Sequence, residues 1–183
     1  SRDISKRLKK GIEYLMKKNS IDYIPAYGKI LDKHSVECKD TAGKLTILTA
    51  ENIIIATGAR AKCFPEMEPD GINIITYKEA MILEKQPKSI IIIGAGAIGI
   101  EFAHFFNIFD TKVTVIEALP QILPIEDEHI SKELASLMKK RKINIHTNTL
   151  VSSISSNNDG VIVTTKDGLN INADKAIIAI GVQ

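Results

Sequence analysis

Three glycines in the middle of the chain have the spacing of a dinucleotide-binding turn. Gly94, Gly96 and Gly99 fit the pattern GxGxxG, and they directly follow four consecutive isoleucines. In such a turn the first glycine permits a tight exit from a strand. The second lets the backbone approach a pyrophosphate, and the third lets the following helix pack closely on the strand. The N-terminus of that helix then offers unpaired N–H groups and the positive end of its dipole to the phosphates. A packed turn that binds no ligand can show the same pattern, so the residues around the turn must distinguish the two interpretations.

A carboxylate at the end of the next predicted strand supports the nucleotide interpretation. Glu117 closes the segment VTVIE, 18 residues after Gly99. A carboxylate at this place accepts hydrogen bonds from the adenine-ribose hydroxyls and repels a 2′-phosphate. The next three residues, ALP, supply no arginine or lysine that could receive such a phosphate. The residues therefore predict binding of NAD rather than NADP.

Glu101 lies two residues beyond the third glycine and has two possible roles. It could be a surface acid in the first turn of the helix, stabilised by the helix dipole. It could instead hold its carboxylate near the nicotinamide. The residues alone favour neither role.

The elements around the glycines predict an α/β fold of the Rossmann type. Strands and helices alternate as βαβαβ, which is typical of a doubly wound nucleotide-binding half with a parallel sheet. A three-stranded antiparallel meander, with turns at Asn158–Gly160 and Lys166–Gly168, precedes a last strand at Lys175–Ile180. The alternating elements are the strand Ser89–Ile93, the helix Ala97–Phe109, the strand Lys112–Glu117, the helix Asp127–Arg141 and the strand Asn144–His146.

The first 62 residues show a different pattern, with one predicted helix followed by short predicted strands. Apolar residues recur at helical spacing from Ile4 to Met16, which predicts a helix that ends at Asn19 and Ser20. The segments YIPAYGKIL, SVECK and KLTILT predict short strands, with a hairpin turn at Asp40–Gly43, and NIIIATGA predicts a further strand that ends in a small-residue turn. Residues 60–71 read as a connection, and a short helix is predicted at Lys78–Glu84.

Composition excludes several partners and settings. The 183 residues carry a formal net charge of +2, which does not favour nucleic acid or a membrane as a partner. The basic clusters RLKK, MKK and MKKRK fall in helix-like segments and read as solvated faces. The apolar runs are too short to span a bilayer, and no signal-peptide pattern opens the chain. Cys38 and Cys63 form neither a CxxC pair nor a metal-ligand cluster, so we expect a reduced, cytoplasmic setting and no metal.

The motifs occur in the order found in a known family. YGKI, NIIIATGA, the run ending in GAGAIGIE, VTVIEALPQILP, DEHISKEL and AIIAIG follow one another over essentially the whole chain. In this order they resemble the pyridine-nucleotide disulfide oxidoreductases, most closely the dihydrolipoamide dehydrogenase branch. The resemblance implies that residues 1–62 are part of an FAD-binding domain, made of a helix and strands, and that residues 63–183 form an NAD-binding domain. It also implies FAD and NAD as cofactors, and a homodimer when the protein is full-length.

The resemblance also assigns binding residues. Without it, Gly28, Ala59 and Val151 would pass as turn and core residues. The residues implied for FAD are Gly28, Thr57, Gly58 and Ala59. The residues implied for NAD are Gly94, Ala95, Gly96, Ala97, Ile98, Gly99, Ile100, Glu101, Glu117, Val151 and Gly181.

Three features of the family do not occur in the chain. These are the GxGxxG that binds FAD, the redox-active CxxxxC pair, and the catalytic His-Glu pair, which none of the four histidines matches. We therefore expect no catalytic residue here and interpret the chain as the central part of a longer enzyme. That enzyme would pass electrons from dihydrolipoamide, carried by a partner protein, through a cysteine pair and FAD to NAD.

Other interpretations stay open. The ending AIGVQ differs from the commoner AIGR, which leaves the subgroup undecided among dihydrolipoamide dehydrogenase, NADH oxidase and the mercuric or glutathione-type reductases. Outside the enzyme class, the chain could be a non-catalytic NAD-sensing module or a purely structural α/β domain.

Overall fold

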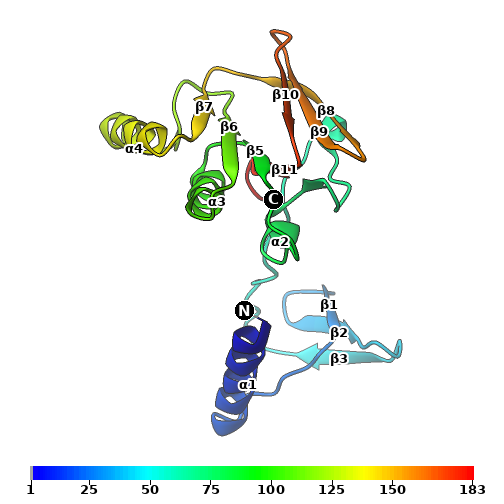
Figure 1. The fold of residues 1–183 in the computed structure, drawn as a ribbon. Coiled ribbons are helices and arrows are strands. Elements are labelled where there is room, and N and C mark those ends of the chain that lie inside the picture. Colours follow the sequence, from blue (N-terminus) through cyan, green and yellow to red (C-terminus); the bar gives the residue numbers. More distant parts are fainter. Residues whose placement is uncertain (1) are drawn as a thin grey trace. The chain divides into compact units, whose positions relative to one another are not determined.

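The computed structural model describes residues 2–183, which divide into two compact units with their boundary between Thr57 and Gly58 (Figure 1). Ala61 makes an isolated antiparallel bridge with Val182, flanked by hydrogen bonds in both directions between the backbones of Arg60 and Gln183. This pairing places residues 60–62 beside residues 181–183, and the domain boundary at residue 62 that the resemblance implies stays a prediction. The assignment of one domain to FAD and the other to NAD stays a prediction.

The first unit contains one helix and one antiparallel sheet. Helix α1 (Arg2–Lys18) ends where predicted, since Ser20 has a positive φ of 54°. The sheet has the order β1-β2-β3, and the turn between its last two strands is held by the carboxylate of Asp40, which accepts hydrogen bonds from the amides of Ala42 and Lys44. The predicted helix, the hairpin and the three strands predicted before Ala50 are confirmed. The strands are β1 (Tyr27–Ile30), β2 (Ser35–Lys39) and β3 (Leu45–Thr49).

One predicted strand is wrong. Residues 52–60, which include NIIIATGA, contain no strand, and Ile54 and Ile55 are 89% and 69% exposed. β-branched residues favour an extended backbone, but a strand also needs a neighbour to receive its hydrogen bonds. No segment of residues 2–183 provides that neighbour here.

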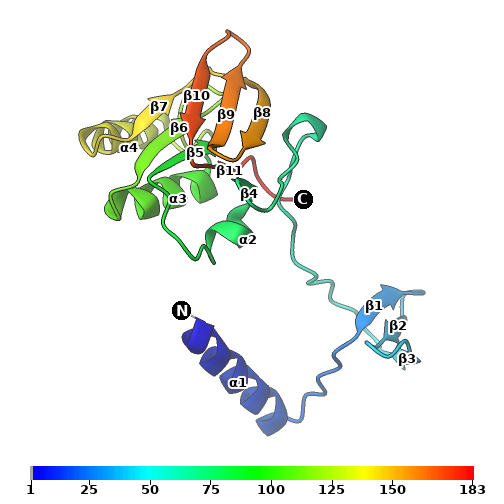
Figure 2. The same ribbon diagram turned by 45° about the vertical axis from the view of Figure 1, so that its right-hand side comes forward.

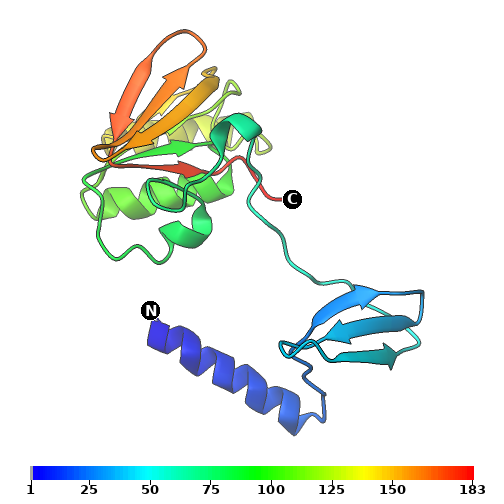
Figure 3. The ribbon, with the colours of Figure 1, turned by 90° about the vertical axis from the view of Figure 1, so that its right-hand side faces the viewer.

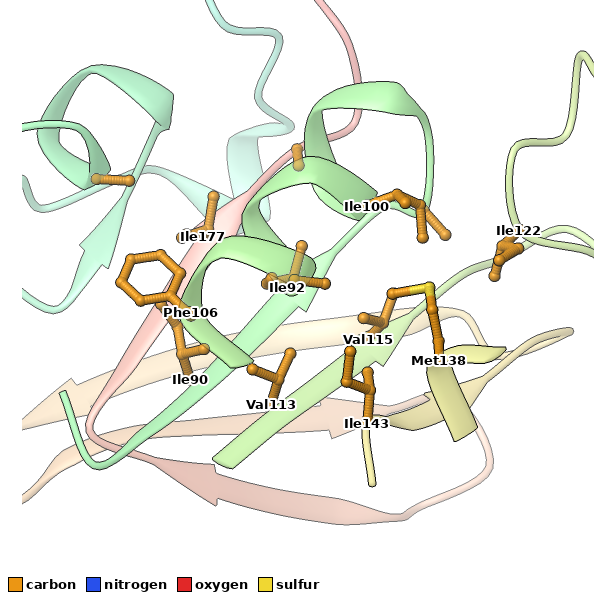
Figure 4. Packing of buried hydrophobic residues seen from close by; sticks show 14 of the residues in the cluster. Ile90, Ile92, Ile100, Phe106, Val113, Val115, Ile122, Met138, Ile143 and Ile177 are labelled. Atoms are coloured by element: carbon orange, nitrogen blue, oxygen red, sulfur yellow. The ribbon is translucent and has the colours of Figure 1, made fainter. Parts of the chain in front are cut away.

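A five-stranded parallel sheet forms the centre of the second unit. Its order is β4-β11-β5-β6-β7, so the isoleucine-rich strand lies inside the sheet as predicted. Ile90 and Ile92 point into the core formed with the helices (Figure 4), and Ile91 and Ile93 point into a second core on the opposite face. A strand that is apolar on both faces fits a position covered on both sides. The strands are β4 (Ile74–Ile75), β5 (Ser89–Ile93), β6 (Lys112–Ile116), β7 (Asn144–His146) and β11 (Lys175–Ile178).

Helices cover one face of this sheet and the meander covers the other (Figures 2 and 3). The helix α4 begins where predicted, because Asp127 caps it by accepting hydrogen bonds from the amides of His129 and Ile130. The predicted helix Lys78–Glu84 is wrong in extent, since a capping box at Thr76 starts it earlier and it ends at Ala80. The elements are η1 (Pro65–Met67), α2 (Tyr77–Ala80), α3 (Ala97–Ile108), α4 (Glu128–Lys140), β8 (Val151–Asn157), β9 (Gly160–Thr165) and β10 (Asn170–Ala173).

Asp70 joins the segment before β4 to the meander. Its Oδ1 accepts hydrogen bonds from the amides of three residues (Ile72, Asn73 and Ile74), and its Oδ2 accepts one from the hydroxyl of Ser156. Partial burial raises the pKa of Asp70, but the hydrogen bonds from Ile72, Ser156, Ile74 and Asn73 together outweigh it and lower the pKa below its ordinary value.

Replacing Asp70 with alanine is expected to lower the free energy of unfolding by about 1 kcal/mol at pH 7, because several amides lose a charged acceptor. The stabilisation is present above the pKa of the unfolded state, about 3.9, and is lost as the pH falls through the lower pKa of the folded state. The deficit of the variant should therefore shrink in acid. Denaturant unfolding between pH 7 and pH 2.5 measures this. Glu84→Ala, an exposed acid without a side-chain hydrogen bond among residues 2–183, is the control. A deficit that is independent of pH would contradict the role of the carboxylate.

Candidate nucleotide-binding site

A cleft of about 480 Å³ lies at the carboxyl ends of β5, β6 and β11. The chain leaves β5 through α3 toward β6 on one side, whereas β11 lies on the other side of β5. In open α/β sheets this change of direction is where ligands bind. Seven of the predicted residues line the cleft: Gly94, Gly96, Ala97, Ile98, Glu117, Val151 and Gly181.

Two glycines of the turn are required by the fold itself. Gly94 has a φ of 101°, and a Cβ there would overlap the carbonyl oxygen of Ala179. A Cβ on Gly99 would overlap the carbonyl oxygen of Gly94, so this glycine sets the close approach of α3 to β5. Neither glycine therefore needs a ligand to explain it.

Gly96 is different. Its φ is −70°, which any residue can adopt, and a Cβ built on it would meet no protein atom within 4 Å. Gly96 is also the N-cap of α3 and provides no side-chain cap, so the first N–H groups of the helix face the cleft without an intrahelical partner. Open space beside a helix N-terminus is what a pyrophosphate requires. The residues present therefore fit a dinucleotide.

Glu117 is buried at the edge of the cleft, with 7% of its surface exposed. Its Oε2 accepts a hydrogen bond from the amide of Ala95 at 2.7 Å, and its Oε1 accepts one from the amide of Leu119 at 2.9 Å. A carboxylate has about four acceptor positions, so both oxygens can still accept hydrogen bonds from ribose hydroxyls.

Four residues predicted to bind NAD do not line the cleft. Ala95 and Ile100 are buried in the helix-side core, and Gly99 packs against β5. Glu101 is exposed on α3 but lies beyond the first turn of the helix, which contains no acidic residue. For these residues a contact with the nucleotide stays a prediction.

The residues predicted for FAD lie in both units. Gly28 is on β1, and Thr57 closes the first unit. Gly58 and Ala59 begin the second unit, and Gly58 has a φ of 77°, which explains the glycine in the small-residue turn. Their role in binding FAD stays a prediction.

Several residues that line the cleft were not singled out in the sequence. Phe64 and Met67 come from the segment around η1, which reads in the sequence as a mere connection. Thr149 and Leu150 precede β8, and Leu119 and other residues follow β6 or β11. Nothing in their own types marks them. A position after a strand of the parallel sheet could have indicated Leu119, Thr149 and Leu150, whereas Phe64 and Met67 precede β4 and carry no such signal. The further lining residues are Ile93, Ile116, Ala118, Pro124, Ala179 and Ile180.

The two cysteines show no sign of redox pairing. Both are free, Cys38 in the first unit and Cys63 in the second. Burial raises the pKa of the Cys63 thiol, and the nearby carboxylates of Glu68 and Glu79 raise it further. A raised pKa keeps the thiol protonated and therefore a poor nucleophile. Among residues 2–183, no group of three or more metal-ligating side chains is arranged to hold an ion, and no helix is long and apolar enough to cross a membrane.

Comparison with known proteins decides the family. The family model described as pyridine nucleotide-disulphide oxidoreductase matches residues 2–183. The chain belongs to this family. The resemblance read from the motifs is thereby confirmed, together with the α/β fold. The family name implies a pyridine nucleotide as a cofactor.

Individual relatives of the family agree. The chain is 38% identical over 187 residues to a dihydrolipoyl dehydrogenase of Zymomonas mobilis, covering 100% of this chain and 40% of the relative. It is 41% identical over 202 residues to a dihydrolipoyl dehydrogenase of Rhizobium etli, covering 100% of this chain and 42% of the relative. The chain thus spans about two fifths of the length of these curated relatives.

Solved structures of other proteins share the fold. LpdA from Mycobacterium tuberculosis has a TM-score of 0.91 at 24% identity, covering 98% of this chain and 40% of that protein, which shows the fold alone. The HOCl-induced flavoprotein disulfide reductase RclA from Escherichia coli has a TM-score of 0.77 at 28% identity, covering 97% of this chain and 42% of that protein. RclA is described as a flavoprotein.

Proposed function

We propose that this chain is the NAD-binding portion of a flavin-dependent disulfide oxidoreductase of the dihydrolipoamide dehydrogenase type. The observation that carries the proposal is the pair of Gly96 and Glu117 on one cleft. Gly96 leaves room that the fold itself does not need, and Glu117 presents a carboxylate at the end of the neighbouring strand. Identities of 38–41% to dihydrolipoyl dehydrogenases support the choice of enzyme type.

The residues of the cleft have separate tasks in this proposal. The pyrophosphate would lie over Gly96 and the first N–H groups of α3. Glu117 would accept hydrogen bonds from the adenosine ribose and repel a 2′-phosphate. Val151 would lie near the adenine, and Gly181 and Glu101 near the nicotinamide. When bound, the nicotinamide supplies the hydride acceptor, and the contribution of this chain is to place and orient it.

The rest of the activity belongs to the longer protein in this proposal. A cysteine pair, FAD and a catalytic His-Glu pair outside this chain would take electrons from dihydrolipoamide on a partner protein. Gly28, Thr57, Gly58 and Ala59 would contribute to the FAD site. Residues 1–62 and 63–183 would be parts of the FAD and NAD domains of a homodimer. The free Cys38 and Cys63 suit a reducing, cytoplasmic setting.

Similarity supports this enzyme type. Curated relatives at 34–41% identity are dihydrolipoyl dehydrogenases. An NADH oxidase or a mercuric or glutathione-type reductase would share the same NAD cleft. A CxxxxC pair upstream of this chain in its complete reading frame supports the proposal, and a single cysteine at that place would point to the oxidase.

Calorimetric titration of the chain with NADH and with NADPH tests the proposal. We expect weak but measurable NADH binding, and NADPH binding that is weaker by about tenfold or more, because a 2′-phosphate would approach the carboxylate of Glu117. The chain alone should hold little FAD and should not oxidise dihydrolipoamide. The absence of NADH heat, or tighter binding of NADPH, would contradict the assignment of Glu117.

A further inference from the structure

Ala95, between the first two glycines of the turn, is held by both of its backbone polar groups. Its amide donates to Oε2 of Glu117 at 2.7 Å, and its carbonyl oxygen accepts a hydrogen bond from the amide of Leu123, also at 2.7 Å. Both partners belong to the connection between β6 and α4. The side chain of Ala95 is fully buried, so water cannot replace these hydrogen bonds without a local opening.

The carboxylate of Glu117 is itself fixed in place. Its second oxygen accepts the hydrogen bond from Leu119, and its backbone is held on both sides: its amide donates to the carbonyl of His146 at 2.8 Å, and its carbonyl accepts from the amide of Thr149 at 2.9 Å. With four such contacts and 7% exposure, the side chain is held toward the turn before any nucleotide arrives.

The remainder of the connection is tied to α4. Leu123 adopts a left-handed backbone with a φ of 46°, and its carbonyl accepts a hydrogen bond from the hydroxyl of Ser131, which is 1% exposed. The amide group of Gln121 donates to the carbonyl of Glu126. The hydrogen bond from Leu123 to Ala95 therefore comes from an ordered support.

We infer that Glu117 is a positioning residue for the glycine turn, in addition to its contact with the ribose. The part of this inference that concerns the ligand rests on the proposed function. One carboxylate both discriminates between nucleotides and keeps the turn ordered. Neutralising Glu117 therefore does not convert the cleft to NADPH, because the loss of repulsion is accompanied by loss of the ordered turn that any pyrophosphate needs.

The replacement Glu117→Gln separates this inference from a purely electrostatic role. Glutamine has one acceptor oxygen and one NH₂ group, whereas the two amides of Ala95 and Leu119 each donate to a different oxygen of Glu117. In either orientation the NH₂ group faces an N–H donor. One of the two hydrogen bonds is therefore lost although the side-chain volume is kept.

Amide hydrogen exchange of the nucleotide-free chain provides the test. Exchange of the Ala95 amide should be about tenfold faster in Glu117→Gln, because its hydrogen bond to a charged acceptor is either lost or, if the glutamine oxygen faces Ala95, replaced by a weaker one to a neutral acceptor. Ile91 and Ile92 in β5 are internal references for an intact fold. Glu126→Gln, which removes a charge from the same connection and no side-chain hydrogen bond within residues 2–183, should leave Ala95 unchanged. Titration of Glu117→Gln should show weaker binding of both NADH and NADPH.

Two results would overturn the inference: unchanged exchange at Ala95, or a tenfold gain in NADPH affinity in Glu117→Gln. Should that variant fail to fold, Glu117→Asp decides, because it keeps the charge but is one methylene too short to reach both amides. Faster Ala95 exchange with NADPH still disfavoured then supports the inference, and unchanged exchange refutes it. If the parent chain binds neither nucleotide, the proposed function fails, while the exchange measurement still decides the link between Glu117 and the turn.

Discussion

Replacing Gly96 with alanine should weaken NADH binding by about a hundredfold while the chain keeps its stability. The added methyl group meets no protein atom within 4 Å, and the backbone at φ −70° suits alanine. By restricting the unfolded chain, such a change stabilises by about 0.4–1 kcal/mol, and a loss of similar size offsets this gain because Gly96 is the N-cap of α3, where alanine is less favourable than glycine. In the complex, however, the methyl group would occupy the space where the pyrophosphate approaches the backbone.

Calorimetry of unfolding together with NADH titration measures both halves of this prediction. Gly11→Ala is the matched control, because Gly11 lies in the middle of α1, also has open space around a Cβ, and is far from the cleft in the sequence. This control should gain stability without any change in NADH affinity. Unaltered NADH binding by Gly96→Ala would show that the pyrophosphate does not lie over the turn. A marked fall in stability would show that the fold itself requires this glycine.

Gly99→Ala, three residues further along, should behave in the opposite way. Its Cβ would overlap the carbonyl oxygen of Gly94 and press on the side chain of Ile92, so α3 must move away from β5. Adding a methyl group to a site that is already closely packed lowers the free energy of unfolding by about 1–3 kcal/mol. An overlap with the backbone, which no rotamer can relieve, lies at the upper end of this range, about 3 kcal/mol.

Denaturant unfolding followed by circular dichroism measures this loss of stability, with Gly96→Ala as the control within the same turn. NADH binding should also fall, because a displaced helix no longer presents its N–H groups to the phosphates. A free energy of unfolding within about 0.5 kcal/mol of the parent, the range of an ordinary surface change, would mean that the helix accommodates the methyl group by a small shift.

Much of the second unit could be predicted because its sequence patterns depend on local constraints. The isoleucines of β5 indicate a strand covered on both faces, and Asp127 marks the start of α4 where the structure has it. The turn at Gly94–Gly99 and the carboxylate of Glu117 come from a pattern in which each residue type has its own steric or electrostatic reason. The cleft then brings seven predicted residues together.

The rest depends on contacts that are distant in the sequence. NIIIATGA has the composition of a strand, but a strand forms only where a partner is present, and the first unit offers none. Phe64 and Met67 reach the cleft because the segment around η1 passes over the ends of the strands, which their residue types do not show. The hydrogen bond from Ala95 to Glu117 joins positions 22 residues apart and needs the final geometry of two neighbouring strand ends.

The bridge between Ala61 and Val182 has a consequence for how this unit can be joined to other polypeptide. The backbones of Arg60 and Gln183 exchange hydrogen bonds in both directions, so these two positions, which bracket the parallel sheet and the meander, lie side by side. Paired residues of antiparallel segments are separated by only about 5 Å between Cα atoms. A host domain could therefore be interrupted at a single surface position and receive the whole unit without parting its own strands. A domain whose two ends lie close together is easily inserted into another domain, exchanged or removed as one piece.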